Sequence, residues 1–110
     1  MADSIDIKEL SELLSTEEKV ILLDVRRKAD YASDTRKIAG SAWCDPEQID
    51  TWAKDLPVGK RTVAYCVKGG SVSQSVADRL KKEGVDAVFL AGGIKSWIED
   101  GRPVESDTVP

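Results

Sequence analysis

The sequence contains no histidine, and this absence removes several kinds of catalytic site at once. A Ser-His-Asp triad and a Cys-His pair both need an imidazole to accept a proton from the nucleophile, so neither can form within this chain. Two cysteines are too few for a four-cysteine zinc site or for the disulfide framework of a small secreted domain. We therefore expect no metal and no cofactor, and we expect a reducing, cytoplasmic compartment.

Long apolar runs and charge of a single sign are also lacking. Apolar stretches such as residues 20–23 are far too short to cross a membrane, and residues 1–4 lack the basic and apolar regions of a signal peptide. The net charge is −4, charges of both signs are interspersed, and aromatic residues make up 5% of the chain. Without a basic stripe we expect no nucleic-acid partner, no membrane partner and, by default, a monomer.

The composition is that of a globular domain. The chain has 110 residues, of which 41% are hydrophobic, so a buried core can form and wholesale disorder is not expected. We predict a single domain over residues 1–110, with its core at about 4–104 and a loose tail from residue 102 to the end.

Predicted strands alternate with predicted helices along the chain. Mainly apolar runs at 20–25, 63–66 and 87–90 are typical of strands buried on both faces, and shorter strands are expected at 4–6 and within 38–43. Between them we expect helices from the Asp6–Glu9 capping box onward and at 27–32, 46–55, 72–83 and 94–100. This alternation predicts an α/β fold: an open, mostly parallel sheet of about five short strands with helices on both faces.

Cys66 ends one of these strands and opens a glycine-rich loop, which consists of Val67, Lys68, Gly69 and Gly70 and leads into a helix near Ser71. In parallel sheets ligands bind beyond the carboxyl ends of the strands. The backbone N–H groups of such a turn can point at one sulfur, and the helix N-terminus adds positive partial charge. We interpret Cys66 as a reactive thiolate; the alternative is a buried cysteine that acts as a small hydrophobe.

Four segments, taken in order, resemble the markers of the single-domain rhodanese family of sulfurtransferases. They are LLDVR at 22–26, IAGSA at 38–42, YCVKGG at 65–70 and LAGGIKSW at 90–97. The resemblance extends over roughly residues 4–104. It implies a rhodanese-like fold and a thiosulfate sulfurtransferase type of activity.

The resemblance also implies a mechanism for Cys66. Its thiolate attacks a sulfane sulfur and becomes a persulfide, and a thiophilic acceptor then takes that sulfur. The N–H groups from Val67 to Ser71, with Gly69 and Gly70 shaping the turn, would stabilise the anionic states. Lys68 would attract an anionic donor such as thiosulfate or a persulfide; a solvated lysine is an equal alternative.

Asp24 and Arg26 belong to the first of the four segments. By the resemblance they would pair or hydrogen-bond near the loop and hold its shape. We favour structural support over a direct part in the chemistry, because such pairs are often structural.

Two departures leave other functions open. Ser71 stands where the family often has an arginine, so a bidentate anion contact is missing and a non-catalytic binding or sensing module is an alternative. In the second segment, residues 37–39 read Lys-Ile-Ala in place of the usual His-Ile-Pro. A phosphatase-like or arsenate-reducing enzyme is disfavoured, because its Cys-x₅-Arg loop would need an arginine where Val72 stands.

Cys44 follows the strand expected within 38–43. If it shares the rim of the sheet with Cys66, it could act as a resolving thiol that takes the persulfide sulfur or forms a disulfide. The simpler interpretation, an inert cysteine, is favoured.

Overall fold

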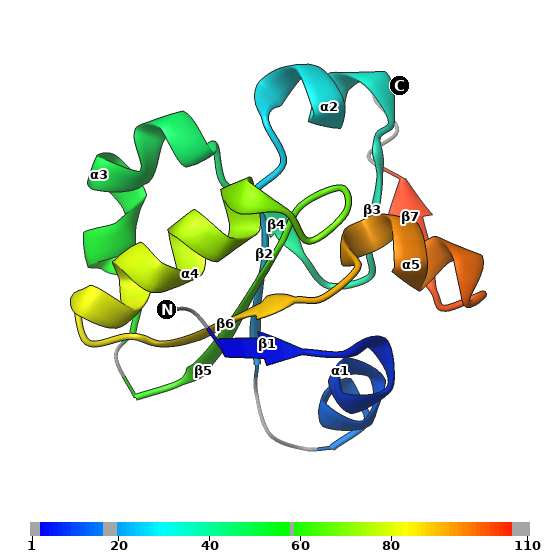
Figure 1. The fold of residues 1–110 in the computed structure, drawn as a ribbon, viewed down its shortest axis with the longest axis horizontal. Coiled ribbons are helices and arrows are strands. Elements are labelled where there is room, and N and C mark those ends of the chain that lie inside the picture. The colour runs from blue at the N-terminus through cyan, green and yellow to red at the C-terminus, as the bar shows by residue number, and fades with distance from the viewer. Residues whose placement is uncertain (1–2, 17–19, 58, 107–110) are drawn as a thin grey trace.

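A five-stranded sheet forms the centre of the computed structural model, which describes residues 3–16, 20–57 and 59–106. The strand order is β1-β6-β5-β2-β4, and every neighbouring pair is parallel (Figure 1). These strands are β1 (Asp3–Ile5), β2 (Ile21–Asp24), β4 (Ala42–Trp43), β5 (Arg61–Tyr65) and β6 (Asp86–Leu90). The predicted parallel sheet is confirmed, with β1 at one edge and β5 near the middle.

Helices cover both faces of this sheet (Figure 1). On one face lie α1 (Ile7–Leu14) and α5 (Gly93–Glu99). On the other lies α4 (Ser71–Lys82), beside the segment formed by η1 (Pro46–Gln48), α3 (Ile49–Trp52) and η2 (Ala53–Asp55). The short α2 (Lys28–Ser33) lies beyond the carboxyl end of β2. Among the described helices, none has the length and apolar character needed to cross a membrane.

Aspartate side chains cap the starts of two helical segments, α1 at Asp6 and the Pro46–Gln48 turn at Asp45. The capping box of α1 is present, with the Glu9 amide donating to the Asp6 carboxylate at 2.7 Å. Along this helix Leu10 is fully buried, whereas Leu14 in the last turn is exposed. The single helix expected over 46–55 is wrong, because this stretch forms one α-helical turn between two 3₁₀ turns, as short connecting segments often do.

The C-terminal segment corrects the expectation of a loose tail. Strand β7 (Val104–Ser106) pairs antiparallel with β3 (Arg36–Ile38) in a second, two-stranded sheet. The indole N–H of the buried Trp97 donates to the Pro103 carbonyl at 2.8 Å, because a buried indole needs an acceptor. Residues 107–110, the rest of that predicted tail, lie outside the described residues.

Candidate functional site

Cys66 directly follows β5 at the carboxyl end of the sheet. It is buried, with 6% of its surface exposed, and its thiol lies 3.1 Å from the hydroxyl oxygen of Ser73 in the first turns of α4. The neutral thiol donates to that oxygen. When the sulfur is ionised the hydroxyl can turn and donate to it instead, because a hydroxyl both donates and accepts. The fully buried Ser73 is thus a built-in partner for a charged sulfur.

The loop after Cys66 leaves its backbone donors unused. No atom within residues 3–16, 20–57 and 59–106 accepts a hydrogen bond from the amides of residues 67–71. Gly70 is the N-cap of α4, so the last of these amides belong to the start of a helix, where positive partial charge collects. Five successive backbone donors at this loop therefore have no protein acceptor within the described residues.

Backbone hydrogen bonds from the start of α5, just after the turn that follows β6, hold the Cys66 loop in place. The amides of Ile94 and Lys95 donate to the carbonyls of Cys66 and Val67, each at 3.0 Å. Gly93 has a φ of +61°, and a methyl group there would overlap both of these carbonyl oxygens. The Gly-Gly pair therefore permits the backbone contact that fixes the position of Cys66.

A cavity of about 370 Å³ opens beside the sulfur. Its lining includes Cys66 and the loop residues Val67, Lys68, Gly70 and Ser71. Gly69 does not line it: this residue packs against the β6–α5 turn, where a methyl group would lie 2.6 Å from the Gly92 amide nitrogen. Four of the five predicted binding residues thus surround one space, and the fifth supports the loop.

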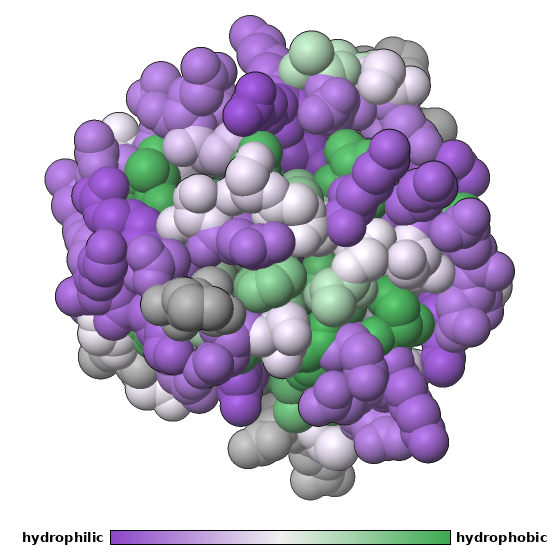
Figure 2. Space-filling model, viewed as in Figure 1, coloured by the Kyte–Doolittle hydropathy of each residue, from purple (hydrophilic) through white to green (hydrophobic). Residues whose placement is uncertain are grey.

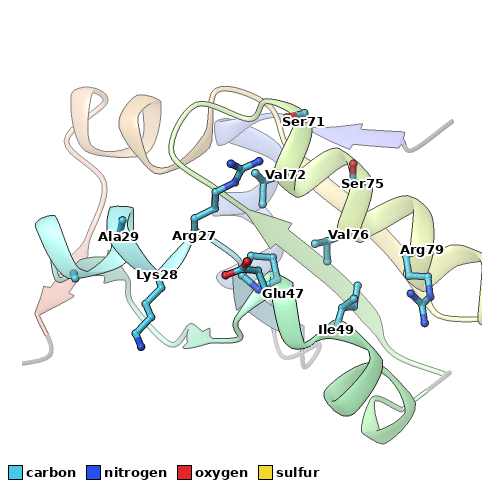
Figure 3. A pocket seen from close by; sticks show the side chains of 12 residues that line it. Arg27, Lys28, Ala29, Glu47, Ile49, Ser71, Val72, Ser75, Val76 and Arg79 are labelled. Atoms are coloured by element: carbon cyan, nitrogen blue, oxygen red, sulfur yellow. The ribbon is translucent and has the colours of Figure 1, made fainter.

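This cavity adjoins a groove of about 980 Å³ that runs between α2, the Pro46–Gln48 turn and α4. Arg27, Ser71 and Val72 line both spaces. Figure 3 shows the Arg27 side chain extending from the end of β2 toward the first turn of α4. Arg27 is exposed, and its guanidinium has no partner among the described residues.

Asp24 and Arg26 form a buried ion pair beside the segment that leads into β3. The closest contact joins Nη2 of Arg26 to Oδ2 of Asp24 at 2.6 Å, and Nε donates to both carboxylate oxygens at 3.0 and 3.1 Å. Nη1 and Nη2 donate to the carbonyls of Asp34 and Arg36, both at 2.8 Å. Burial lowers the pKa of Arg26, but the hydrogen bond and charge of Asp24 outweigh this effect and hold that pKa above its ordinary value. The pair thus fixes the chain that enters β3, and in the described residues its side chains do not hydrogen-bond to the loop.

Cys44 lies at the same edge of the sheet but is separated from Cys66 by a strand. The register aligns Asp24 of β2 with Trp43 on one side and Tyr65 on the other, so the two cysteines flank Val25. Two strand spacings of about 4.8 Å place their backbones roughly 10 Å apart, which is too far for a disulfide without backbone movement. Burial, followed by the charge of Asp24, raises the pKa of the Cys44 thiol.

Ser73 and Arg27 are the two residues that sequence reasoning missed. Ser73 had a readable signal, since it belongs to the same helical stripe as Val76, Ala77 and Leu80 and is a polar residue on a buried face. Arg27 had no such signal in the sequence, because only the path of the chain after β2 brings this residue to the cavity.

Comparisons with known proteins agree with this geometry. A family model described as the rhodanese-like domain matches residues 6–100. A protein named sulfurtransferase from Allochromatium vinosum is 30% identical over 105 residues, covering 94% of this chain and 95% of that protein. The sulfurtransferase expectation drawn from the four segments is therefore confirmed at the level of the family.

Solved structures show the same fold. A rhodanese-related protein from Thermoplasma volcanium superposes with a TM-score of 0.80 at 29% identity, covering 94% of this chain and 97% of that one. A thiosulfate sulfurtransferase from Pseudomonas aeruginosa gives a TM-score of 0.80 at 28% identity. That match covers 96% of this chain but 20% of the other, so this chain corresponds to a part of the larger protein.

Proposed function

The chain belongs to the rhodanese-like sulfurtransferase family, and on that premise we propose that it transfers a sulfane sulfur through a persulfide on Cys66. The donor is a small sulfur anion, thiosulfate or a persulfide, and the acceptor is a thiophilic group such as cyanide or a thiol. The observation that carries the proposal is the position of the sulfur, which lines a cavity whose loop amides have no acceptor among the described residues.

The proposed reaction has two steps. The Cys66 thiolate attacks the outer sulfur of thiosulfate, the S–S bond of the donor breaks, and its electron pair leaves with sulfite. An acceptor nucleophile then attacks the outer sulfur of the persulfide, and the thiolate leaves; with cyanide the product is thiocyanate. Negative charge remains at the loop throughout, so fixed amide dipoles stabilise each state without reorganising.

Each neighbouring residue has a part in this proposal. Ser73 donates a hydrogen bond to the ionised sulfur, and Lys68, exposed at the cavity, attracts the donor anion. Asp24 and Arg26 act indirectly, by holding the segment that leads into β3. Cys44 takes no part in the transfer, since its pKa is raised and β2 lies between the two cysteines.

The test is the intact mass of the protein after incubation with thiosulfate. We expect wild type and Cys44→Ser to gain the mass of one sulfur atom, and Cys66→Ser to gain nothing. Cyanide should remove the added mass and release an equal amount of thiocyanate.

Other results would redirect the proposal. If thiosulfate, polysulfide and glutathione persulfide all leave the wild-type mass unchanged, the chain is better described as a binding or sensing module, the alternative that Ser71 raises. If Cys44→Ser abolishes the gain while Cys66→Ser keeps it, the sulfur carrier is the other cysteine.

A further inference from the structure

The short helix α2 forms a wall of each cavity around the Cys66 loop. Asp30 of this helix and Arg27, its N-cap residue, line the Cys66 cavity. Other residues of the same helix line the larger groove. Asp30 and Val67 also line a further cavity of about 290 Å³, so α2 borders the loop on more than one side. The position of α2 therefore decides the shape of the space beside the sulfur.

The hydrophobic core does not hold α2 in this position. All six residues of the helix are described, and none of them is buried. Tyr31 is half-buried and the other five are exposed. The side chain of Arg27 makes no capping hydrogen bond, and a helix of this length is not stable by itself. The helix must therefore be held by Tyr31 and by the chain on either side of it.

Three side chains from different elements contact one another beside this helix. The Tyr31 ring stacks on the indole of Trp43 in β4, with the ring centroids 4.8 Å apart and the planes 10° from parallel. The guanidinium carbon of Arg26 lies 5.3 Å from the Tyr31 centroid, within the range of a cation–π contact. Offset stacking of two aromatic rings is a favourable arrangement. We call Arg26, Tyr31 and Trp43 the α2 clasp.

The α2 clasp also holds the chain at both ends of the helix. Before the helix, the indole N–H of Trp43 donates to the carbonyl of Arg26 at 2.9 Å. After the helix, Nη1 of Arg26 donates to the carbonyl of Asp34 at 2.8 Å. Arg26 is itself fixed by its buried ion pair with Asp24. Both ends of α2 and its one half-buried residue thus depend on the same three side chains.

We propose that Tyr31 and Trp43 are positioning residues for sulfur transfer, because through the α2 clasp they hold one wall of the Cys66 cavity in place. Among the described residues that line this cavity, neither is present, so both act through α2. Without the clasp, α2 would occupy its position in a fraction of the molecules. The apparent affinity for a donor would fall by that fraction. This inference rests on the proposed function and adds the residues that shape the cavity.

The first experiment is limited proteolysis, which does not depend on sulfur transfer. Trypsin cleaves after Arg27 and Lys28, which are exposed at the start of α2. We expect Tyr31→Ala and Trp43→Ala to be cut there about tenfold or more faster than wild type, because a loosened helix opens locally. Cleavage after the exposed Lys60 is the internal reference, since global unfolding would accelerate it as well.

Trp52→Ala is the matched control for Trp43→Ala. Both tryptophans are half-buried, and each indole donates to a backbone carbonyl, that of Trp52 to Asp45 at 2.8 Å. Trp52 belongs to α3 and not to the α2 clasp. We expect Trp52→Ala to be cut after Arg27 and Lys28 at the wild-type rate.

The second experiment measures steady-state kinetics with thiosulfate as donor and cyanide as acceptor. We expect Tyr31→Ala and Trp43→Ala to raise KM about five- to tenfold and to change kcat less than about twofold, because the sulfur and its loop are untouched. Tyr31→Phe keeps the ring and should stay within about twofold of wild type. The double alanine variant should be no worse than the worse single variant, whereas independent effects would multiply.

Alkylation of Cys66 by N-ethylmaleimide, a neutral reagent, supplies a readout of opposite sign. Loss of the α2 wall should make the sulfur more accessible and raise this rate about threefold, while the affinity for thiosulfate falls. A variant that only disturbed the thiolate would be alkylated more slowly. Tyr31→Leu, which keeps apolar bulk without a ring, repeats each measurement if an alanine variant does not fold.

The outcomes that overturn the inference are specific. It fails if Tyr31→Ala is cut after Arg27 and Lys28 no faster than Trp52→Ala, whether or not the protein transfers sulfur. It also fails if cleavage accelerates but KM for thiosulfate stays within twofold. If wild type transfers no sulfur, the proposed function fails instead, and the maleimide rate decides the inference: a faster rate in Tyr31→Ala supports the wall, and an unchanged rate overturns it.

Discussion

The two faces of the sheet are packed with side chains of different size. Toward α1 and α5 the buried cluster contains Trp97, Tyr65 and several leucine and isoleucine residues, and no alanine. Toward α3 and α4, four of the nine buried residues are alanines. The helix α4 packs on this face of small side chains, and its first turns carry Ser73 beside Cys66.

If Cys66 carries the sulfur as proposed, this difference separates the face that stabilises the fold from the face that carries the reaction. The α1/α5 face buries the largest side chains, and through the start of α5 it also holds the Cys66 loop by two backbone hydrogen bonds. The α3/α4 face carries the sulfur, the cavity and the adjoining groove. Figure 2 shows apolar side chains gathered between polar ones on the surface near β1 and α1 as well, so exposed apolar surface alone does not mark the site.

The largest expected effect is a loss of stability on the bulky face. Trp97→Ala removes a buried indole and its hydrogen bond to Pro103, and we expect it to cost about 4 kcal/mol. Trp52→Ala, a half-buried tryptophan on the other face, should cost about half as much. Urea denaturation measures both, and equal losses would contradict the assignment of stability to one face.

The contact between the two regions can be broken at Gly93. Gly93→Ala should cost about 2–3 kcal/mol and reduce persulfide formation at least about tenfold, because the methyl group overlaps the carbonyls of Cys66 and Val67. Gly101→Ala is the matched control: its φ is +72°, but the methyl group meets nothing within 4 Å. That variant should lose about 1 kcal/mol from backbone strain and keep its activity. If both lose activity equally, the turn does not position the sulfur.

The reactive face is tested by Ser73→Ala. Loss of the hydroxyl removes one hydrogen bond to the sulfur, so we expect iodoacetamide to alkylate Cys66 about three- to tenfold more slowly at pH 7. Thr51→Ala, an exposed position on α3, should leave this rate unchanged. An alkylation rate that does not fall would show that Ser73 only fills space.

The smallest effect is expected at Cys44. Because burial raises its pKa, less of this thiol is ionised at pH 8 than in a free cysteine, and its alkylation should be slow and accelerate as the pH rises above about 9. Cys44→Ser should change sulfur transfer less than about twofold. Alkylation of Cys44 as fast as that of Cys66 at pH 8, measured by peptide mass spectrometry, would contradict this.

Several features of the fold could be predicted because their signals are local. The apolar run of β2, the capping box at Asp6 and the glycine-rich turn after Cys66 each involve residues that are close in the sequence. The expected helix over 46–55 was a local error, whereas the expected loose tail was wrong because of a contact between distant parts of the chain. Strand β7 forms because it pairs with β3, about 70 residues earlier, and nothing in residues 102–106 alone indicates that partner.

The candidate site shows the same division. Cys66 and its loop were predicted from the strand–turn–helix pattern, and the burial of Asp24 with Arg26 agrees with the expected pairing. The other partners of the Arg26 guanidinium are the backbone carbonyls of Asp34 and Arg36. They were not predictable, because the path of the chain through α2 and β3 brings them to Arg26.

The sequence by itself determined the alternation of strands and helices and the position of Cys66 between a strand and a glycine-rich loop. These depend on short-range apolar patterns and on the conformational freedom of glycine. Only the tertiary structure decided that Ser73 faces the sulfur, that Gly93 supports the loop and that Arg27 joins the cavity to the groove. The physical reason is that strand order and close helix packing bring together residues whose separation along the chain carries no signal of contact.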